Sequence, residues 1–287
     1  AEEWTMIRLR LQLGRFALPA QPTGFAPADY AQHLMTLKDK LAKGTFSVVL
    51  EPPFVVIGDE PVATVTRRAK QTVRFAVSRL KTQYFSKDPT EILDIWLFQG
   101  DASYRANAKA LFGDIPDTPY GYYSHTQKAL VMNIATGGGT LVHEIVHPFI
   151  ATNFPECPTL FNEGLASLYE QSGDADGRII GHTNWRLKGL QEAIRSKGLA
   201  SFEDLCKTSQ TQFYREDKGA NYAQARYLCY YLQEKGLLGT YYRAFVQAAK
   251  DDPAGYRTLC EVLGKPDMAE WQKGWEEWVL GLKYAER

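Results

Sequence analysis

Residues 143–147 read His-Glu-Ile-Val-His, a spacing of two histidines around a glutamate that can do metal chemistry. On an α-helix, residues four positions apart lie on one face, so both imidazoles can reach the same ion. Glu144 projects about 100° away from His143 on such a helix, where its carboxylate can take a proton from a water that the metal activates. The chain contains only 5 histidines, so chance is a poor explanation for this arrangement.

A third metal ligand is predicted at Glu163, on the segment that follows the two histidines. Zinc in catalytic sites commonly takes three protein ligands and keeps its fourth position open. We therefore expect one Zn²⁺ per chain, held by His143, His147 and Glu163. If the helix continues past Glu163, Glu170 lies two turns further on nearly the same face. Asn162 and Glu170 are then expected to support the ligating side chains from outside the coordination sphere.

The HEIVH motif followed by FNEGLAS at 161–167 resembles the gluzincins, the metallopeptidase group that includes thermolysin and the aminopeptidase N family. The Tyr-Gly-Tyr-Tyr segment at 120–123, a strand and a Gly-Thr step into the helix are similar to small peptidase MA-like metallohydrolases. The resemblance covers about residues 120–230. It implies an α+β fold, with a gluzincin or thermolysin-like zincin catalytic domain and a C-terminal helical lobe, and a zinc-dependent peptidase activity.

The resemblance also implies an oxyanion donor, because aminopeptidase N relatives carry a tyrosine at the start of an apolar helix. Tyr222 matches that position and would donate a hydrogen bond to the tetrahedral intermediate. No GAMEN-like segment precedes the zinc helix, so exopeptidase and endopeptidase activity both stay open. His182, Arg186 and Asn133 are predicted to contact the substrate. The segment 131–134, expected as an edge strand, could bind an extended peptide by strand addition.

The elements that must position these residues alternate between strand and helix up to the metal motif, and are helical after it. Apolar runs predict strands, and apolar residues at helical spacing predict amphipathic helices. The sequence predicts two short strands within 46–57, a helix over 65–85, a strand at 92–98, a helix at 102–111, a loop at 113–121 and a strand at 128–134. From Thr140 onward we expect almost only helices.

Three parts of the chain follow from this pattern. Residues 1–45 are expected to be an N-terminal accessory segment, 46–165 the zincin catalytic subdomain with the sheet and the HExxH helix, and 166–287 a helical subdomain that completes the active-site cleft. Pro148 directly follows His147 and lacks a backbone N–H, which predicts a kink. The site tolerates such a kink, because the metal needs only the turn between the histidines.

Composition limits the classes of partner. The 287 residues are 45% hydrophobic and 23% charged, as in an ordinary globular protein, and 33 basic residues balance 33 acidic ones. This balance argues against nucleic acid as a partner. No apolar run is long enough for a membrane span. A peptide or protein substrate is expected, and the oligomeric state stays open.

The N-terminus and the cysteines bear on location and redox state. The start at Ala1, without Met and followed by two glutamates, indicates a mature end left by signal-peptide removal, and hence a periplasmic or secreted protein. A trimmed chain would look the same, so a cytoplasmic location stays open. Cys157, Cys206, Cys229 and Cys260 are compatible with two disulfides or with buried thiols.

Two other functions are consistent with the same residues. A zinc metallohydrolase acting on a non-peptide amide or ester needs the same metal, base and oxyanion donor. A catalytically silent zinc-binding or scaffold protein is the second alternative, and the intact Glu144 argues against it.

Overall fold

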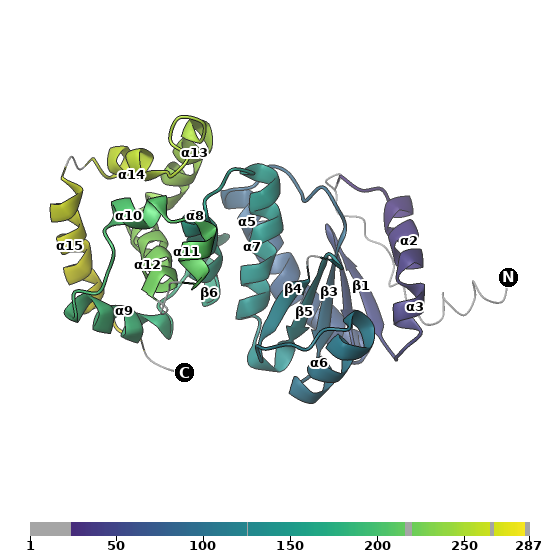
Figure 1. The fold of residues 1–287 in the computed structure, drawn as a ribbon. Helices are drawn as coiled ribbons and strands as arrows, with labels where there is room; N and C mark the ends of the chain where they lie inside the picture. Colours follow the sequence, from purple (N-terminus) through teal and green to yellow (C-terminus); the bar gives the residue numbers. More distant parts are fainter. Residues whose placement is uncertain (1–23, 125, 216–219, 265–266, 285–287) are drawn as a thin grey trace. The chain divides into compact units, whose positions relative to one another are not determined.

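The computed structural model describes residues 24–124, 126–215, 220–264 and 267–284 (Figure 1). Contacts divide the chain into two compact units: Ala1–Ser78 with Asp88–Glu144, and Arg79–Lys87 with Ile145–Arg287. The division passes through two helices, α5 (Phe75–Gln83) and α7 (Gly139–Asn153). The first unit contains a sheet and the second is mainly helical, so the fold is α+β, as the sequence predicts.

A five-stranded mixed sheet forms the centre of the first unit. Its strands are β1 (Ser47–Glu51), β2 (Phe54–Gly58), β3 (Leu93–Phe98), β4 (Gly121–Ser124) and β5 (Ala129–Asn133), in the order β1-β2-β3-β5-β4. The three inner strands β2, β3 and β5 run parallel, whereas β1 and β4 pair antiparallel at the two edges. Every residue of the inner strands is buried. Apart from Asp94 in β3 and Asn133 in β5, these strands are mainly apolar, which is typical of strands that are covered on both faces.

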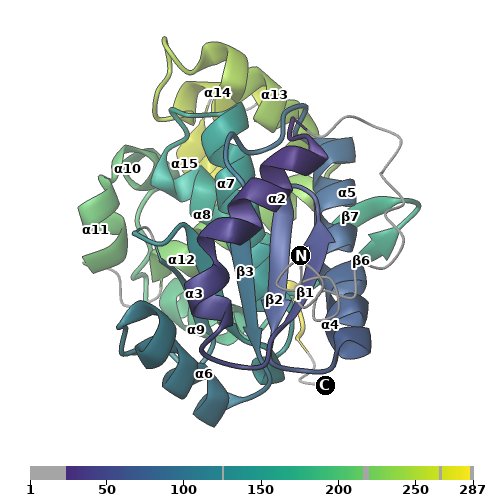
Figure 2. The same ribbon diagram turned by 90° about the vertical axis from the view of Figure 1, so that its right-hand side faces the viewer.

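Helices cover this sheet. They are α2 (Pro27–Thr36), α3 (Lys38–Leu41), α4 (Val62–Arg68), α6 (Asp101–Asn107), the π-helical segments η1 (Ala69–Arg74) and η2 (Ala108–Phe112) and the short turn η3 (Ile134–Thr136). In Figure 2, α2 and α3 lie across the face of the sheet that is turned to the viewer. Alternate strand residues point to that face. They form one core with residues of the covering helices: Tyr30, Leu37, Val55, Ile57, Trp96, Phe98, Tyr104, Leu111 and Val131.

The predicted strands and helices of the first unit are confirmed, with local differences in two helices. The helix expected over 102–111 ends in the π-helical segment η2, and a similar turn interrupts the helix expected over 65–85. That helix is α4, η1 and α5 in direct succession, so its middle turn has π rather than α geometry. Local π turns depend on side-chain packing, and the period of the apolar residues does not reveal them.

The prediction that 131–134 is an edge strand is wrong. Strand β5 is hydrogen-bonded to β3 on one side and to β4 on the other. Within the described part of the chain, β1 and β4 are the sheet's edge strands. The backbone groups of β5 are thus used on both sides, and an extended peptide cannot add to it.

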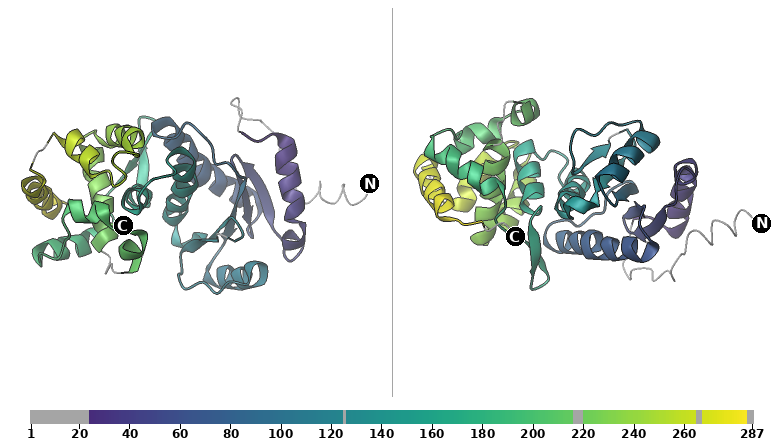
Figure 3. Two further views of the ribbon diagram at one scale, coloured as in Figure 1. Left: turned by 45° about the horizontal axis from the view of Figure 1, so that its top comes forward. Right: turned by 90° about the horizontal axis from the view of Figure 1, so that it is seen from below.

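The second unit is built mainly of helices. They are α8 (Thr159–Leu168), α9 (Arg186–Arg195), α10 (Phe202–Lys207), α11 (Gln210–Arg215), α12 (Ala220–Glu234), α13 (Leu238–Ala248), α14 (Tyr256–Leu263) and α15 (Met268–Gly281). The expectation of almost only helices after Thr140 is confirmed, with one exception: β6 (Ser172–Ala175) and β7 (Arg178–Gly181) form an antiparallel hairpin. Figure 3 (right) shows this hairpin projecting beyond the neighbouring helices of the unit.

The hairpin has a clear local cause. Asp176 and Gly177 form its two-residue loop, with φ angles of 52° and 78°. Both angles lie in the left-handed region, which Asp-Gly loops adopt most readily in tight hairpins. Two contacts attach the hairpin to the end of α5: Arg79 pairs with Asp174 at 2.6 Å, and Gln83 accepts a hydrogen bond from the Ile179 amide at 2.7 Å.

A buried arginine closes the C-terminal end of α8. Arg226, on α12, is 0% exposed and donates to the carbonyl oxygens of Ser167, at 3.0 Å, and of Leu168 and His182. The last carbonyls of a helix have no partner within it, so this guanidinium supplies donors that the fold needs.

Replacing Arg226 with methionine should lower the free energy of unfolding by about 3 kcal/mol, because buried carbonyls lose their donors. Chemical denaturation followed by circular dichroism measures this loss. Arg257→Met is the control, since Arg257 lies on the exposed side of α14 with its side chain 59% accessible. Equal stability of the two variants would contradict the structural role of Arg226.

Three further predictions concern the N-terminus, the cysteines and membrane spans. The proposed signal-peptide boundary at Ala1, and residues 1–23 of the accessory segment, lie outside the described residues. All four cysteines are free thiols in the structure. Burial raises the pKa of Cys206 and of Cys229 to about 12, which keeps both protonated. In the described ranges, no helix combines the length and apolar character that a membrane crossing requires.

Candidate metal centre

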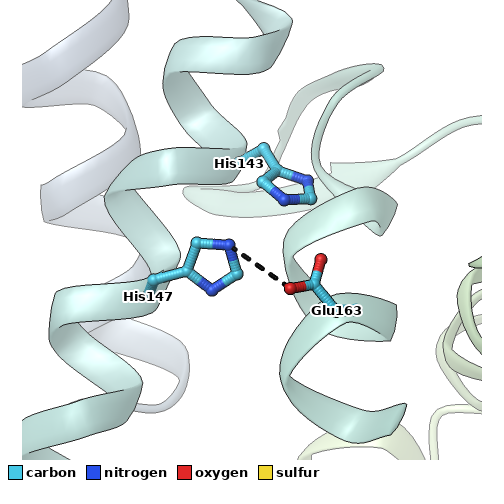
Figure 4. Close-up of side chains that lie close together, drawn as sticks. All are labelled: His143, His147 and Glu163. Carbon is cyan, nitrogen blue, oxygen red and sulfur yellow. Dashed lines mark ion pairs between the residues drawn. The ribbon is translucent and has the colours of Figure 1, made fainter. Parts of the chain in front are cut away.

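Helix α7 presents the two predicted histidines on one face. His143 and His147 lie four residues apart on it, and Figure 4 shows both rings directed toward Glu163 on α8. Pro148 lies inside the same helix, which nevertheless continues to Asn153. Because proline has no N–H, the carbonyl of Glu144 loses its usual helical partner, but the turn that carries both histidines is helical.

Helix α8 carries Glu163 and is fixed by its packing against α12. A Cβ atom at Gly164 would lie 2.8 Å from the carbonyl oxygen of Ala225 and 3.1 Å from Cys229 Sγ. Only glycine therefore allows the two helices to approach so closely. On another side of α8, the ring of Phe161 packs edge-on against Tyr241, with centroids 5.3 Å apart. These contacts hold the neighbouring Glu163 in one place.

The three predicted ligands lie close together. One donor atom from each of His143, His147 and Glu163 lies within 4.8 Å of the other two. His147 Nε2 is 3.9 Å from Glu163 Oε1. Two ligand atoms bound to one zinc at tetrahedral angles would be about 3.4 Å apart, since each lies about 2.1 Å from the metal. The donor set and its spacing thus fit a zinc ion after side-chain movements of about 1 Å.

Asn162 determines which nitrogen of His147 can bind a metal. Its side-chain oxygen lies 2.9 Å from His147 Nδ1. An amide oxygen only accepts hydrogen bonds, so this contact places the ring proton on Nδ1. Nε2 is then the ring nitrogen without a proton, and it faces Glu163 Oε1 at 3.9 Å, the arrangement that outer hydrogen bonds give to metal-binding histidines.

The case for this site rests on its own side chains. No protein-family model matches the chain, and no curated protein matches it either. Only the chemistry and geometry of the described residues therefore support a function.

Glu144, the predicted base, is half-buried on α7 next to His143. Its carboxylate makes no hydrogen bond or ion pair with another residue in the described ranges. The group is therefore available to accept a proton from a water molecule near the histidines.

Two tyrosines lie beside Glu163, and only one of them was predicted. Tyr222, at the start of α12, packs against Tyr214 of α11 with ring centroids 5.9 Å apart. Burial, the Glu163 carboxylate and Tyr214 raise the pKa of Tyr222 well above its usual range, so it keeps its proton at neutral pH. Tyr214 itself donates a hydrogen bond to Glu163 Oε1 at 2.5 Å. No local motif marks Tyr214, which lies 51 residues from Glu163 in the sequence.

The predicted helical placement of Glu170 is wrong. Helix α8 ends at Leu168, so Glu170 lies beyond it rather than on the face of Glu163. Its carboxylate pairs with Arg186 at 3.0 Å and accepts a hydrogen bond from Asn184 at 3.3 Å. Arg186 also lies against the Tyr222 ring, with its guanidinium carbon 5.3 Å from the centroid.

The other residues predicted to contact substrate lie in different surroundings. His182 is exposed, in the connection between β7 and α9. Asn133 is 3% exposed, donates to the carbonyl oxygen of Pro119 at 2.9 Å and accepts from the amide of Ala135 at 3.2 Å. These contacts give Asn133 a structural role at the open end of the β4–β5 hairpin, where it ties the backbone before β4 to the backbone after β5.

Proposed function

We propose that this chain is a zinc-dependent hydrolase of the gluzincin type that cleaves peptide bonds. The observation that carries the proposal is the convergence of His143, His147 and Glu163, whose donor atoms lie within 4.8 Å of one another. Two histidine nitrogens and one carboxylate are the ligands of many catalytic zinc sites. The half-buried glutamate beside the first histidine adds a base that a purely structural site does not require.

The gluzincin assignment draws further support from the order of the elements. A helix with the HExxH motif follows a mixed sheet, and the next helix, α8, carries the Asn-Glu-Gly segment. Gly164 allows α8 to approach α12, which brings the start of α12 and its Tyr222 toward Glu163. The three residues of this segment therefore have separate tasks: Asn162 orients His147, Glu163 offers a ligand oxygen, and Gly164 permits close packing.

In this proposal, His143 Nε2 or Nδ1, His147 Nε2 and a Glu163 oxygen hold the metal. When bound, zinc supplies Lewis acidity that lowers the pKa of water toward about 7 and polarises the scissile carbonyl. Glu144 takes the proton from the attacking water and then delivers it to the nitrogen of the departing amine. Tyr222 keeps its proton and donates a hydrogen bond to the oxygen that becomes negatively charged.

Substrate binding involves residues of the second unit. Arg186 lies against the ring of Tyr222, so it would contact a substrate that Tyr222 contacts. Because Glu170 already pairs with the Arg186 guanidinium, the positive charge there is largely neutralised. We propose that Arg186 presents the planar face of its side chain to an apolar or neutral part of the peptide.

Metal content and cleavage test this proposal together. Mass spectrometry of the untagged protein should find about one zinc per chain. The zinc-loaded protein should cleave members of a mixed peptide library, with products identified by their masses. Cleavage of non-peptide amides or esters alone would favour the alternative hydrolase. Zinc without any cleavage would favour a silent zinc-binding protein, and absence of zinc after incubation with it would overturn the metal site.

A further inference from the structure

Tyr214 is in direct contact with the carboxylate of the third proposed ligand. Its hydroxyl donates to Glu163 Oε1 at 2.5 Å, a short bond of the kind that charged acceptors form. Glu163 is only 4% exposed, so its carboxylate is largely removed from water and depends on protein donors. The same oxygen, Oε1, faces His147 Nε2 at 3.9 Å. Tyr214 therefore holds the oxygen that faces the histidine.

Tyr222 packs against Tyr214. The Tyr222 hydroxyl also interacts with the Tyr214 hydroxyl, and the centroids of the two rings are 5.9 Å apart. The ring of Phe213 contacts both tyrosine rings, with centroids 5.7 Å from Tyr214 and 5.1 Å from Tyr222. The contacts among these three rings thus hold Tyr214 in place, and its hydroxyl donates to Glu163.

Packing does not explain the position of Tyr214. Its side chain is 42% exposed, although the ring neighbours Phe213 and Tyr222 are buried or half-buried. A tyrosine that served only the core would bury its ring and leave the hydroxyl toward water. Here the residue remains accessible, although its hydroxyl is directed to a buried carboxylate. The arrangement serves the orientation of Glu163.

We propose that Tyr214 is a positioning residue for the metal ligand Glu163, with Tyr222 holding Tyr214 in place. The inference rests on the zinc site proposed above. A carboxylate oxygen has two lone pairs, so Oε1 can accept the Tyr214 hydrogen bond and still offer a lone pair to zinc. Outer hydrogen bonds of this kind fix the direction of ligating groups, and their loss typically weakens metal binding about 10–100-fold.

Zinc affinity of the full chain, measured by competition with a chromophoric chelator, tests this inference without relying on catalysis. Tyr214→Phe should weaken zinc binding about 10–100-fold, and Tyr222→Phe should weaken it less, because it acts through Tyr214. Tyr120→Phe is the matched control: this tyrosine is 54% exposed, lies in the other unit and should bind zinc like the wild type. Circular dichroism verifies that the three variants are folded.

Cobalt(II) provides a second measurement that a merely structural role would not change. The visible absorption bands of bound Co²⁺ depend on the directions of its ligands, so Tyr214→Phe should alter their intensity and Tyr120→Phe should not. Wild-type zinc affinity and spectra in a folded Tyr214→Phe variant would overturn the positioning role while leaving the proposed function intact. Tighter zinc binding in that variant would also overturn it, since Tyr214 would then compete with the metal. A wild-type chain that binds no zinc would overturn both proposals.

Discussion

Replacing Glu144 with glutamine should leave zinc content unchanged and lower kcat about 10²–10⁴-fold, the contribution of a positioned general base. Glutamine has nearly the same size as glutamate but cannot accept a proton from water. Glu144 is not one of the clustered donor groups, and its carboxylate has no partner among the described residues, so no structural contact is lost. Peptide cleavage rates at saturating substrate measure the effect, and mass spectrometry measures the zinc.

The control for this substitution is Glu192→Gln, on the exposed side of α9. It removes the same charge far from the histidines in sequence and should keep both zinc and turnover. A Glu144→Gln variant with near wild-type turnover would exclude this residue as the base. A variant that also lost its zinc would show that Glu144 contributes to the metal site, contrary to the geometry.

The sequence predicted much of the first unit because the signals there are local. Residues 54–58 form an apolar run and residues 93–98 are apolar except for Asp94, and the structure buries both segments as inner strands. Pairing order is not local. The segment 131–134 looked like an edge strand, but the short strand at 121–124 pairs with its outer side. That strand contains Gly121 and two tyrosines, too weak an apolar pattern to be recognised without the sheet.

The end of α8 shows a second limit of prediction from sequence. Residues 161–170 contain good helix formers, so the sequence predicts a continuous helix through Glu170. Helix α8 stops at Leu168, where Arg226, nearly sixty residues later, satisfies its final carbonyls. The Asp176–Gly177 pair that follows is typical of a tight hairpin turn. The helical pattern of the surrounding residues nevertheless led to a prediction of helix for this segment.

The residues of the candidate site also differ in how far local sequence predicts them. The proximity of His143 and His147 follows from helical spacing alone. Glu163 was predicted from the resemblance of residues 161–167 to the gluzincins. The close approach of its helix α8 to α12 depends on Gly164. Tyr214 could not be predicted, because its contact with Glu163 requires α11 to pack against α8 across 51 residues of sequence. The sequence thus identifies the candidate ligands and Asn162, which orients His147, whereas an orienting group such as Tyr214 depends on tertiary packing.

The second large effect concerns the metal itself. His143→Ala and Glu163→Ala should each reduce zinc from about one ion per chain to near zero, because two remaining ligands do not form a stable zinc site. The matched controls are His182→Ala and Glu192→Ala, which remove the same side-chain types at exposed positions and should retain zinc. Retention of zinc by both ligand variants would contradict the site.

Thermal unfolding is an independent test of this prediction. Zinc at 100 times its dissociation constant should stabilise the wild-type chain by about 2.7 kcal/mol, because it binds the folded protein. The same addition should not shift the unfolding temperature of His143→Ala or Glu163→Ala, whereas His182→Ala should shift like the wild type. Equal zinc-induced shifts in all four proteins would place the bound metal elsewhere. Because stabilisation reports binding rather than turnover, this measurement separates a zinc site without catalysis from the absence of a zinc site.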